Sequence, residues 1–78
     1  IFKSMIIHFS KHARVRQKER RISSALVRKI IDNPDKINHI ENDRFICYGK
    51  DNKQTLAIVF IKRREFVNIV TIYYENYL

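Results

Sequence analysis

The sequence predicts an α+β fold, with an N-terminal strand and two helices ahead of an antiparallel β-meander of three or four strands. Two observations predict this order. Residues 10–33 contain no Gly or Pro and carry Ser residues where helix caps are expected. Residues 37–74 alternate apolar runs with polar turns, which are too short for crossovers and therefore join antiparallel neighbours. No repeat or linker divides the chain, so we expect a single domain over residues 1–78.

The two expected helices differ in how much apolar surface they offer. Ser10 can accept a hydrogen bond from a free amide of the first helix, which offers only Ala13 and Val15 to a core. That helix should therefore lie mostly exposed. Ser23 is placed to cap the second helix, which ends at Asn33-Pro34 because Pro cannot continue it. The second helix has an apolar face at helical spacing, formed by Ile22, Leu26, Val27, Ile30 and Ile31.

The remaining apolar segments are expected to be strands. They span residues 5–9, 37–40, 45–48, 55–61 and 66–74. Residues 56–61 and 67–72 are almost continuously apolar, as is typical of central strands that helices cover on one face. The residues expected in the core are Leu26, Ile30, Leu56, Ile58, Phe60 and Val70.

Composition excludes several classes of protein. At 45% hydrophobic and 12% aromatic residues, the chain is too apolar for a disordered segment. No apolar run is long enough to span a membrane, and the N-terminus lacks the pattern of a secretory signal. The single Cys, Cys47, permits no internal disulfide and fits a reducing cytoplasm. We expect Met5 to be the natural start, with residues 1–4 a remnant ahead of it.

The positive charge is concentrated in the first part of the chain. Residues 1–31 hold nine Lys or Arg and one acid, so the whole formal net charge of +8 lies there. Such a surface favours nucleic acid or an acidic protein as a partner, and a basic but merely solvated surface is the plainer alternative.

A basic stripe on the first helix is the sequence's most informative feature. His12, Arg16 and Arg20 recur every fourth residue and share one helix face, with Glu19 in reach of Arg16. Guanidinium groups bind phosphate, and an imidazole can exchange a proton near neutral pH.

The same residues carry a resemblance to a known family. The pattern His12-Ala-x-x-Arg16-x-x-x-Arg20-x-Ile-Ser23 resembles the opening of a small bacterial domain family of unassigned function, which we place among the RelE-like and BrnT-like ribonuclease toxins. The order of the expected elements also resembles RelE-like toxins. One departure concerns the turn, where Arg21 stands in place of the usual Gly.

The resemblance implies an endoribonuclease toxin that cleaves RNA without a metal or cofactor and is inhibited by an antitoxin protein. It implies His12 as general acid or base and Arg16 and Arg20 as phosphate ligands. The last strands help form the RNA-binding face in RelE-like folds, which adds Thr71 and Tyr73 to the catalytic group. Strand alternation would place these two on one sheet face with Val67 and Ile69. The further residues expected to bind RNA are Lys11, Arg14, Lys62, Arg63 and Arg64.

Each of these residues also has a plain structural interpretation. His12 could cap or pack in the first turn, Thr71 and Tyr73 could be ordinary strand residues, and residues 62–64 could be a charged hairpin tip. Arg14 lies off the basic stripe, as do Lys18 and Arg21, where a solvated face suffices. His8 and His12 have the spacing of a helical metal pair, but His8 falls in a strand segment, so no zinc site is expected.

Two other functions remain open at this point. The basic stripe could bind nucleic acid without catalysis, or the basic face could dock an acidic protein partner. No membrane contact is expected, and the sequence specifies no oligomeric state.

Overall fold

The computed structural model describes residues 5–75, so the expected remnant at residues 1–4 lies outside the described part. The elements are β1 (Ile6–Phe9), α1 (Lys11–Glu19), α2 (Ser24–Asp32), β2 (Lys36–Glu41), β3 (Arg44–Asp51), β4 (Gln54–Lys62) and β5 (Phe66–Glu75). The α+β class and the order of elements are confirmed.

The five strands form one mixed sheet in the order β1-β5-β4-β3-β2. The meander β2 to β5 is antiparallel, as predicted. The predicted meander of three or four strands does not describe the whole sheet, because β1 joins it, pairs in parallel with β5 and aligns Ile7 with Val67 and Phe9 with Ile69. This pairing follows from the position of β5, which is the last strand of the meander and has an edge that β4 does not cover. Adding β1 there brings its apolar side chains to the core.

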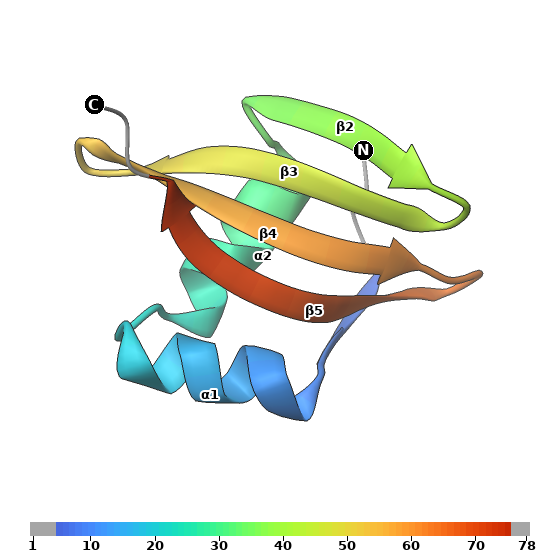
Figure 1. The fold of residues 1–78 in the computed structure, drawn as a ribbon, viewed down its shortest axis with the longest axis horizontal. Helices are drawn as coiled ribbons and strands as arrows, with labels where there is room; N and C mark the ends of the chain where they lie inside the picture. The colour runs from blue at the N-terminus through green and yellow to red at the C-terminus, as the bar shows by residue number, and fades with distance from the viewer. Residues whose placement is uncertain (1–4, 76–78) are drawn as a thin grey trace.

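Both helices lie on the same side of the sheet, with α1 beside β5 and α2 against β3 (Figure 1). The predicted caps are confirmed: the Ser10 Oγ atom accepts from the Ala13 N–H at 3.0 Å, and the Ser23 Oγ atom accepts from the Leu26 N–H at 3.0 Å. The other face of the sheet carries no helix within residues 5–75.

The core lies between the helices and the inner sheet face. Four of the predicted core residues, Ile30, Leu56, Ile58 and Phe60, are buried there. Leu26 is only half-buried and packs at the margin of the core. From α1, Ala13 is buried as predicted, but Val15 was wrongly assigned and is 45% exposed. Gln17, one turn after Ala13, takes the buried position instead.

Gln17 can be buried because both ends of its amide are satisfied. Its Oε1 atom accepts from Arg14 Nη1 at 2.9 Å, and its Nε2 atom donates to Ser24 Oγ at 2.9 Å. A buried amide without partners would be costly, whereas this one links α1 to α2.

A bulge in β5 interrupts the strand alternation that the sequence predicted. Val59 pairs with Thr71 while Phe60 pairs with Ile69, so Val70 is an extra residue without a partner in β4. Such a bulge reverses the faces of all residues that follow it. Val70 is therefore half-buried and was wrongly assigned to the core. Ile72 turns to the core, and Thr71 no longer shares a face with Ile69.

The turn between the helices contains Arg21, which stands where the family-like pattern has Gly. This residue has a φ of 54°, in the left-handed region that favours Gly. Replacing Arg21 by Gly should raise the free energy of unfolding by up to about 1 kcal/mol. Gly removes the steric cost of the left-handed conformation, and this gain exceeds the conformational entropy that Gly adds to the unfolded chain. Urea denaturation of the parent, Arg21→Gly and Arg21→Val measures this. Arg21→Val as stable as Arg21→Gly would contradict a strained turn.

Candidate nucleic-acid interface at the edge of β5

The candidate site lies at the edge of β5, which β1 covers only in part. β1 pairs with β5 over Phe66–Ile69 alone, so from Val70 onward no strand lies on that side within residues 5–75. α1 runs along this edge and its side chains reach the backbone of β5. The Ser10 Oγ atom donates to the Val70 carbonyl at 3.0 Å, and the Ser10 N–H donates to the Ile69 carbonyl at 2.9 Å. Ser10 thus fixes the start of α1 against β5 while it caps the helix.

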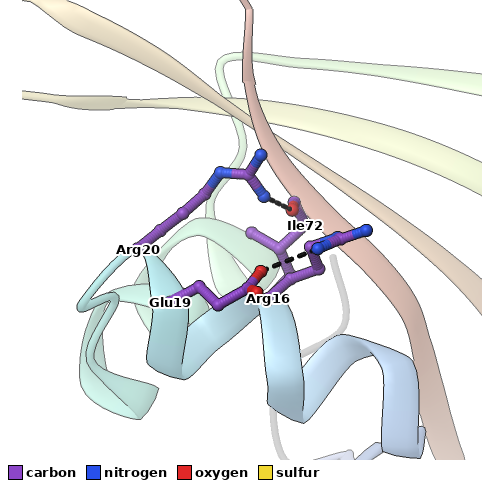
Figure 2. Close-up of polar contacts among 4 residues, drawn as sticks. All are labelled: Arg16, Glu19, Arg20 and Ile72. Carbon is purple, nitrogen blue, oxygen red and sulfur yellow. Dashed lines mark hydrogen bonds and ion pairs between the residues drawn. The ribbon is translucent and has the colours of Figure 1, made fainter.

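The two arginines of the basic stripe both extend from α1 toward β5 (Figure 2). Arg20, the C-cap residue of α1, donates from Nη1 to the Ile72 carbonyl at 3.3 Å. Arg16 forms an ion pair with Glu19, with Nη1 and Oε1 separated by 2.7 Å. His12 and Arg16 therefore lie one turn apart on α1, and Arg20 follows at its C-cap beside the uncovered part of β5.

His12 lies in the first turn of α1 and is exposed to solvent. Within residues 5–75 its side chain takes part in no hydrogen bond or ion pair, and the Ser10 hydroxyl caps the helix instead. The imidazole is therefore accessible, and the capping interpretation of His12 is unnecessary.

Thr71 and Tyr73 are the neighbours of Ile72 in β5, whose carbonyl accepts from Arg20, but they lie on the other face of the sheet. Thr71 pairs with Val59 and Tyr73 with Ala57, two residues that lie outside the helix-side core. Thr71 and Tyr73 are half-buried on this open face. A ligand that touches both the basic stripe and these two side chains must wrap around the edge of β5.

Tyr48 belongs with Tyr73, although the sequence analysis did not single it out. Both pair with Ala57, from β3 and β5, so two tyrosines flank one small residue on the open face. Burial raises the pKa of Tyr48, and the charges of Glu75 and Tyr73 raise it further. Strand alternation would have placed Tyr48 opposite to Cys47, but only the register between strands brings it beside Tyr73.

The other predicted RNA-binding residues are spread over the surface. Lys11 begins α1 and is exposed. Lys62, Arg63 and Arg64 are exposed at the β4–β5 turn, where Arg63 Nη1 lies 3.3 Å from Asp43 Oδ2. Four residues of β5, roughly 13 Å, separate this turn from Ser10. Arg14 faces β1, with its Cζ atom 4.0 Å from the centre of the Phe9 ring, so it lies away from the basic stripe.

A hydrogen bond between a tyrosine and an aspartate lies near the C-terminal end of β5. The Tyr74 hydroxyl donates to Asp51 Oδ2 at 2.6 Å, which joins β5 to the end of β3. This hydrogen bond, together with burial and the Asp51 charge, raises the pKa of Tyr74 to about 12, and the Arg20 charge acts in the opposite direction. Arg20 is thus close enough to Tyr74 to influence its ionisation.

The pKa of Tyr74 predicts a loss of stability in alkali. Its value is above the ordinary 10.0, so the protonated hydroxyl stabilises the fold below about pH 10 and this contribution disappears as the pH rises toward 12. In the Tyr74→Phe variant, the free energy of unfolding should fall less steeply over this range. Urea denaturation at several alkaline pH values measures the slope. Equal slopes in the parent and the variant would contradict the Tyr74–Asp51 hydrogen bond.

The structure offers no alternative chemistry from the remaining candidates. His8 lies in β1 and packs against Phe66 at 4.7 Å between ring centres, so it does not share a helix with His12. No group of three His, Cys, Asp or Glu within residues 5–75 is arranged to hold a metal ion. Cys47 is buried, and this burial raises its pKa to about 12, which fits the predicted core residue. No helix among the described residues is long and apolar enough to cross a membrane.

Comparison with known proteins identifies the family of this chain. Comparisons with curated proteins and with solved structures found no match. Residues 9–74, which include all of α1 and nearly all of β5, match the family model described as a domain of unknown function, DUF4258. The chain therefore belongs to the DUF4258 family.

Proposed function

We propose that this domain is a RelE-like endoribonuclease that cleaves RNA without a metal, as the cytoplasmic toxin of a bacterial toxin–antitoxin pair. The observation that supports this proposal most strongly is the basic stripe, which joins an accessible imidazole to two arginines along the uncovered part of β5. The whole formal net charge of +8 lies in residues 1–31, the part of the chain that carries this stripe.

The chemistry needs one titrating group and fixed positive charge. In the proposed step, the RNA 2′-oxygen bonds to phosphorus while its proton passes to His12. The bond from phosphorus to the 5′-oxygen breaks, and that oxygen takes a proton from water. The products are a 2′,3′-cyclic phosphate and a 5′-hydroxyl end. Arg16 and Arg20 stabilise the negative charge that develops on the phosphorane oxygens.

The existing contacts of the two arginines are compatible with this role. Arg16 and Glu19 have side chains that are 37% and 55% exposed, and such surface pairs contribute about 0.2–1 kcal/mol. A phosphate can therefore replace Glu19 at little cost. Arg20 uses one N–H of a guanidinium that has five, so the Ile72 carbonyl can orient it while other donors bind phosphate.

The open sheet face would hold the bases next to the cleaved bond. Tyr73 and Tyr48 flank Ala57 there and offer two aromatic rings to unstacked bases, which is how many proteins bind single-stranded RNA. Thr71 lies on the same face nearer the bulge. The basic β4–β5 turn would bind the RNA backbone farther along.

Cleavage by the purified full chain tests the proposal. An RNA oligonucleotide and its matched DNA version are incubated with the protein in excess EDTA, and the product ends are identified by mass spectrometry. We expect only the RNA to be cut, with cyclic-phosphate ends. Uncut RNA in the purified system and on ribosomes, or equal cutting of DNA, would overturn the proposal.

A second candidate function is nucleic-acid binding without catalysis. It is favoured by one observation: no described side chain orients the His12 imidazole through a hydrogen bond. Under this alternative, the basic stripe contacts phosphates and nothing more. A mobility shift with intact RNA, in the absence of any cleavage product, would distinguish it from the nuclease.

A further inference from the structure

A groove beside β1 lies apart from the basic stripe. It has a volume of about 600 Å³ and is lined by apolar side chains of β1, among them Ile7 and Phe9, with Arg14 of α1 and Arg28 of α2 at its border. Ile6, which also lines it, is 58% exposed. We call this feature the β1 groove. The groove follows β1, one of the two edge strands of the sheet.

The backbone of β1 has a free side next to this groove. The Ile6 N–H donates to the Glu65 carbonyl and the Ser10 N–H to the Ile69 carbonyl, so even-numbered residues face β5. Alternation turns the N–H and C=O groups of Ile7 and Phe9 to the opposite side. Within residues 5–75, no hydrogen bond reaches them there. A strand edge of this kind can pair with an added strand.

The charged side chains that line the groove are of one sign. Its lining includes two guanidinium groups and no carboxylate. Arg28 contacts the chain just before β1, where its Nη2 atom donates to the Met5 carbonyl at 2.6 Å. Its Nη1 atom lies 3.3 Å from Asp32 Oδ1. Arg14 lies over the Phe9 ring and donates to Gln17. Each guanidinium has five N–H donors, so these contacts leave donors for a ligand carboxylate.

We propose that the β1 groove binds an extended acidic segment of a partner protein, which adds a strand to the free edge of β1. Its backbone would pair with Ile7 and Phe9. Its alternate apolar side chains would fill the groove, and its carboxylates would bind Arg14 and Arg28. Strand addition combines backbone pairing with pockets for alternate side chains, which nucleic acids cannot reproduce. The inference goes beyond RNA cleavage and does not depend on it.

A designed peptide tests this surface on the full chain. The probe is a capped seven-residue peptide that alternates Glu with Val and Ile, titrated into ¹⁵N-labelled protein. We expect saturable shifts of the Ile7 and Phe9 amide signals. A peptide with Lys in place of Glu should bind roughly tenfold more weakly or worse, because it brings like charges to the two arginines. A peptide with N-methylated backbone amides should also lose binding.

Matched variants separate specific binding from general charge attraction. Arg14→Gln/Arg28→Gln should weaken peptide binding by roughly tenfold or more, while Arg44→Gln/Lys53→Gln removes equal charge elsewhere and should change it little. Amide spectra show whether each variant remains folded, and if Arg28→Gln disturbs β1, Arg14→Gln alone decides the charge test. Unshifted Ile7 and Phe9 amides, equal affinity for the Lys peptide, or the same shifts on addition of RNA would overturn the inference. RNA cleavage measured on the same variants is a separate readout.

Discussion

Replacing His12 with Ala should lower the rate of RNA cleavage by about a hundred- to ten-thousand-fold, the usual cost of losing a general acid or base. His12 is exposed and its side chain forms no hydrogen bond or ion pair with the rest of residues 5–75, so the variant should stay folded and still bind RNA. Single-turnover cleavage from pH 5 to pH 9 measures the effect, and growth arrest on expression should disappear with it.

The matched control for His12 is His8→Ala. His8 is the neighbouring histidine, but it lies in β1 and packs against Phe66. Its loss should leave the cleavage rate within a few-fold of the parent. If His12→Ala cleaves RNA as fast as the parent across this pH range, His12 has no part in proton transfer. The binding function would then be the better account.

Replacing Ile30 with Ala should reduce the free energy of unfolding by about 2–5 kcal/mol. Ile30 is buried and lies directly over Gly49, where an added Cβ atom would be 2.5 Å from Ile30 Cγ1. The cavity left by Ala would therefore lie at the contact between α2 and β3. A domain of this length has a total stability of about 4–12 kcal/mol, so the upper end of this loss would equal the lower end of the total.

Leu26→Ala provides the internal comparison for Ile30→Ala. Leu26 lies on the same helix but is half-buried at the margin of the core. Urea denaturation should show a clearly smaller loss for Leu26→Ala. A larger loss for Leu26 than for Ile30, or an Ile30 variant as stable as the parent, would show that the register of α2 on β3 is wrong.

The helices and the meander were predictable because their signals are local. Ser10 and Ser23 cap through bonds to residues three positions ahead, and short turns permit only antiparallel neighbours. The parallel pairing of β1 with β5 was not predictable in this way. It joins segments about sixty residues apart, and no local pattern encodes which edge the first strand will take.

The errors in the predicted core and site have one common cause. Whether a single residue is buried, and which face of the sheet it takes, depends on partners that are distant in the sequence. The bulge at Val70 changed the faces of Thr71 and Tyr73, although the residues around it alternate as a regular strand would. Gln17 replaced Val15 in the interior because Arg14 and Ser24 satisfy its amide. The spacing of His12 and Arg16, by contrast, depends on the helix alone, and α1 spans both residues, while Arg20 lies at its C-cap.

The dependence of RNA binding on salt tests the role of the basic stripe most directly. The slope of log affinity against log salt is measured for the parent, for Arg16→Ala/Arg20→Ala, and for Lys18→Ala/Arg21→Ala, which removes equal charge outside the stripe. If Arg16 and Arg20 each contact a phosphate, the first variant should lose about two units of slope and the second much less. An unchanged slope in the first variant, or the same loss in both, would contradict phosphate binding by the basic stripe.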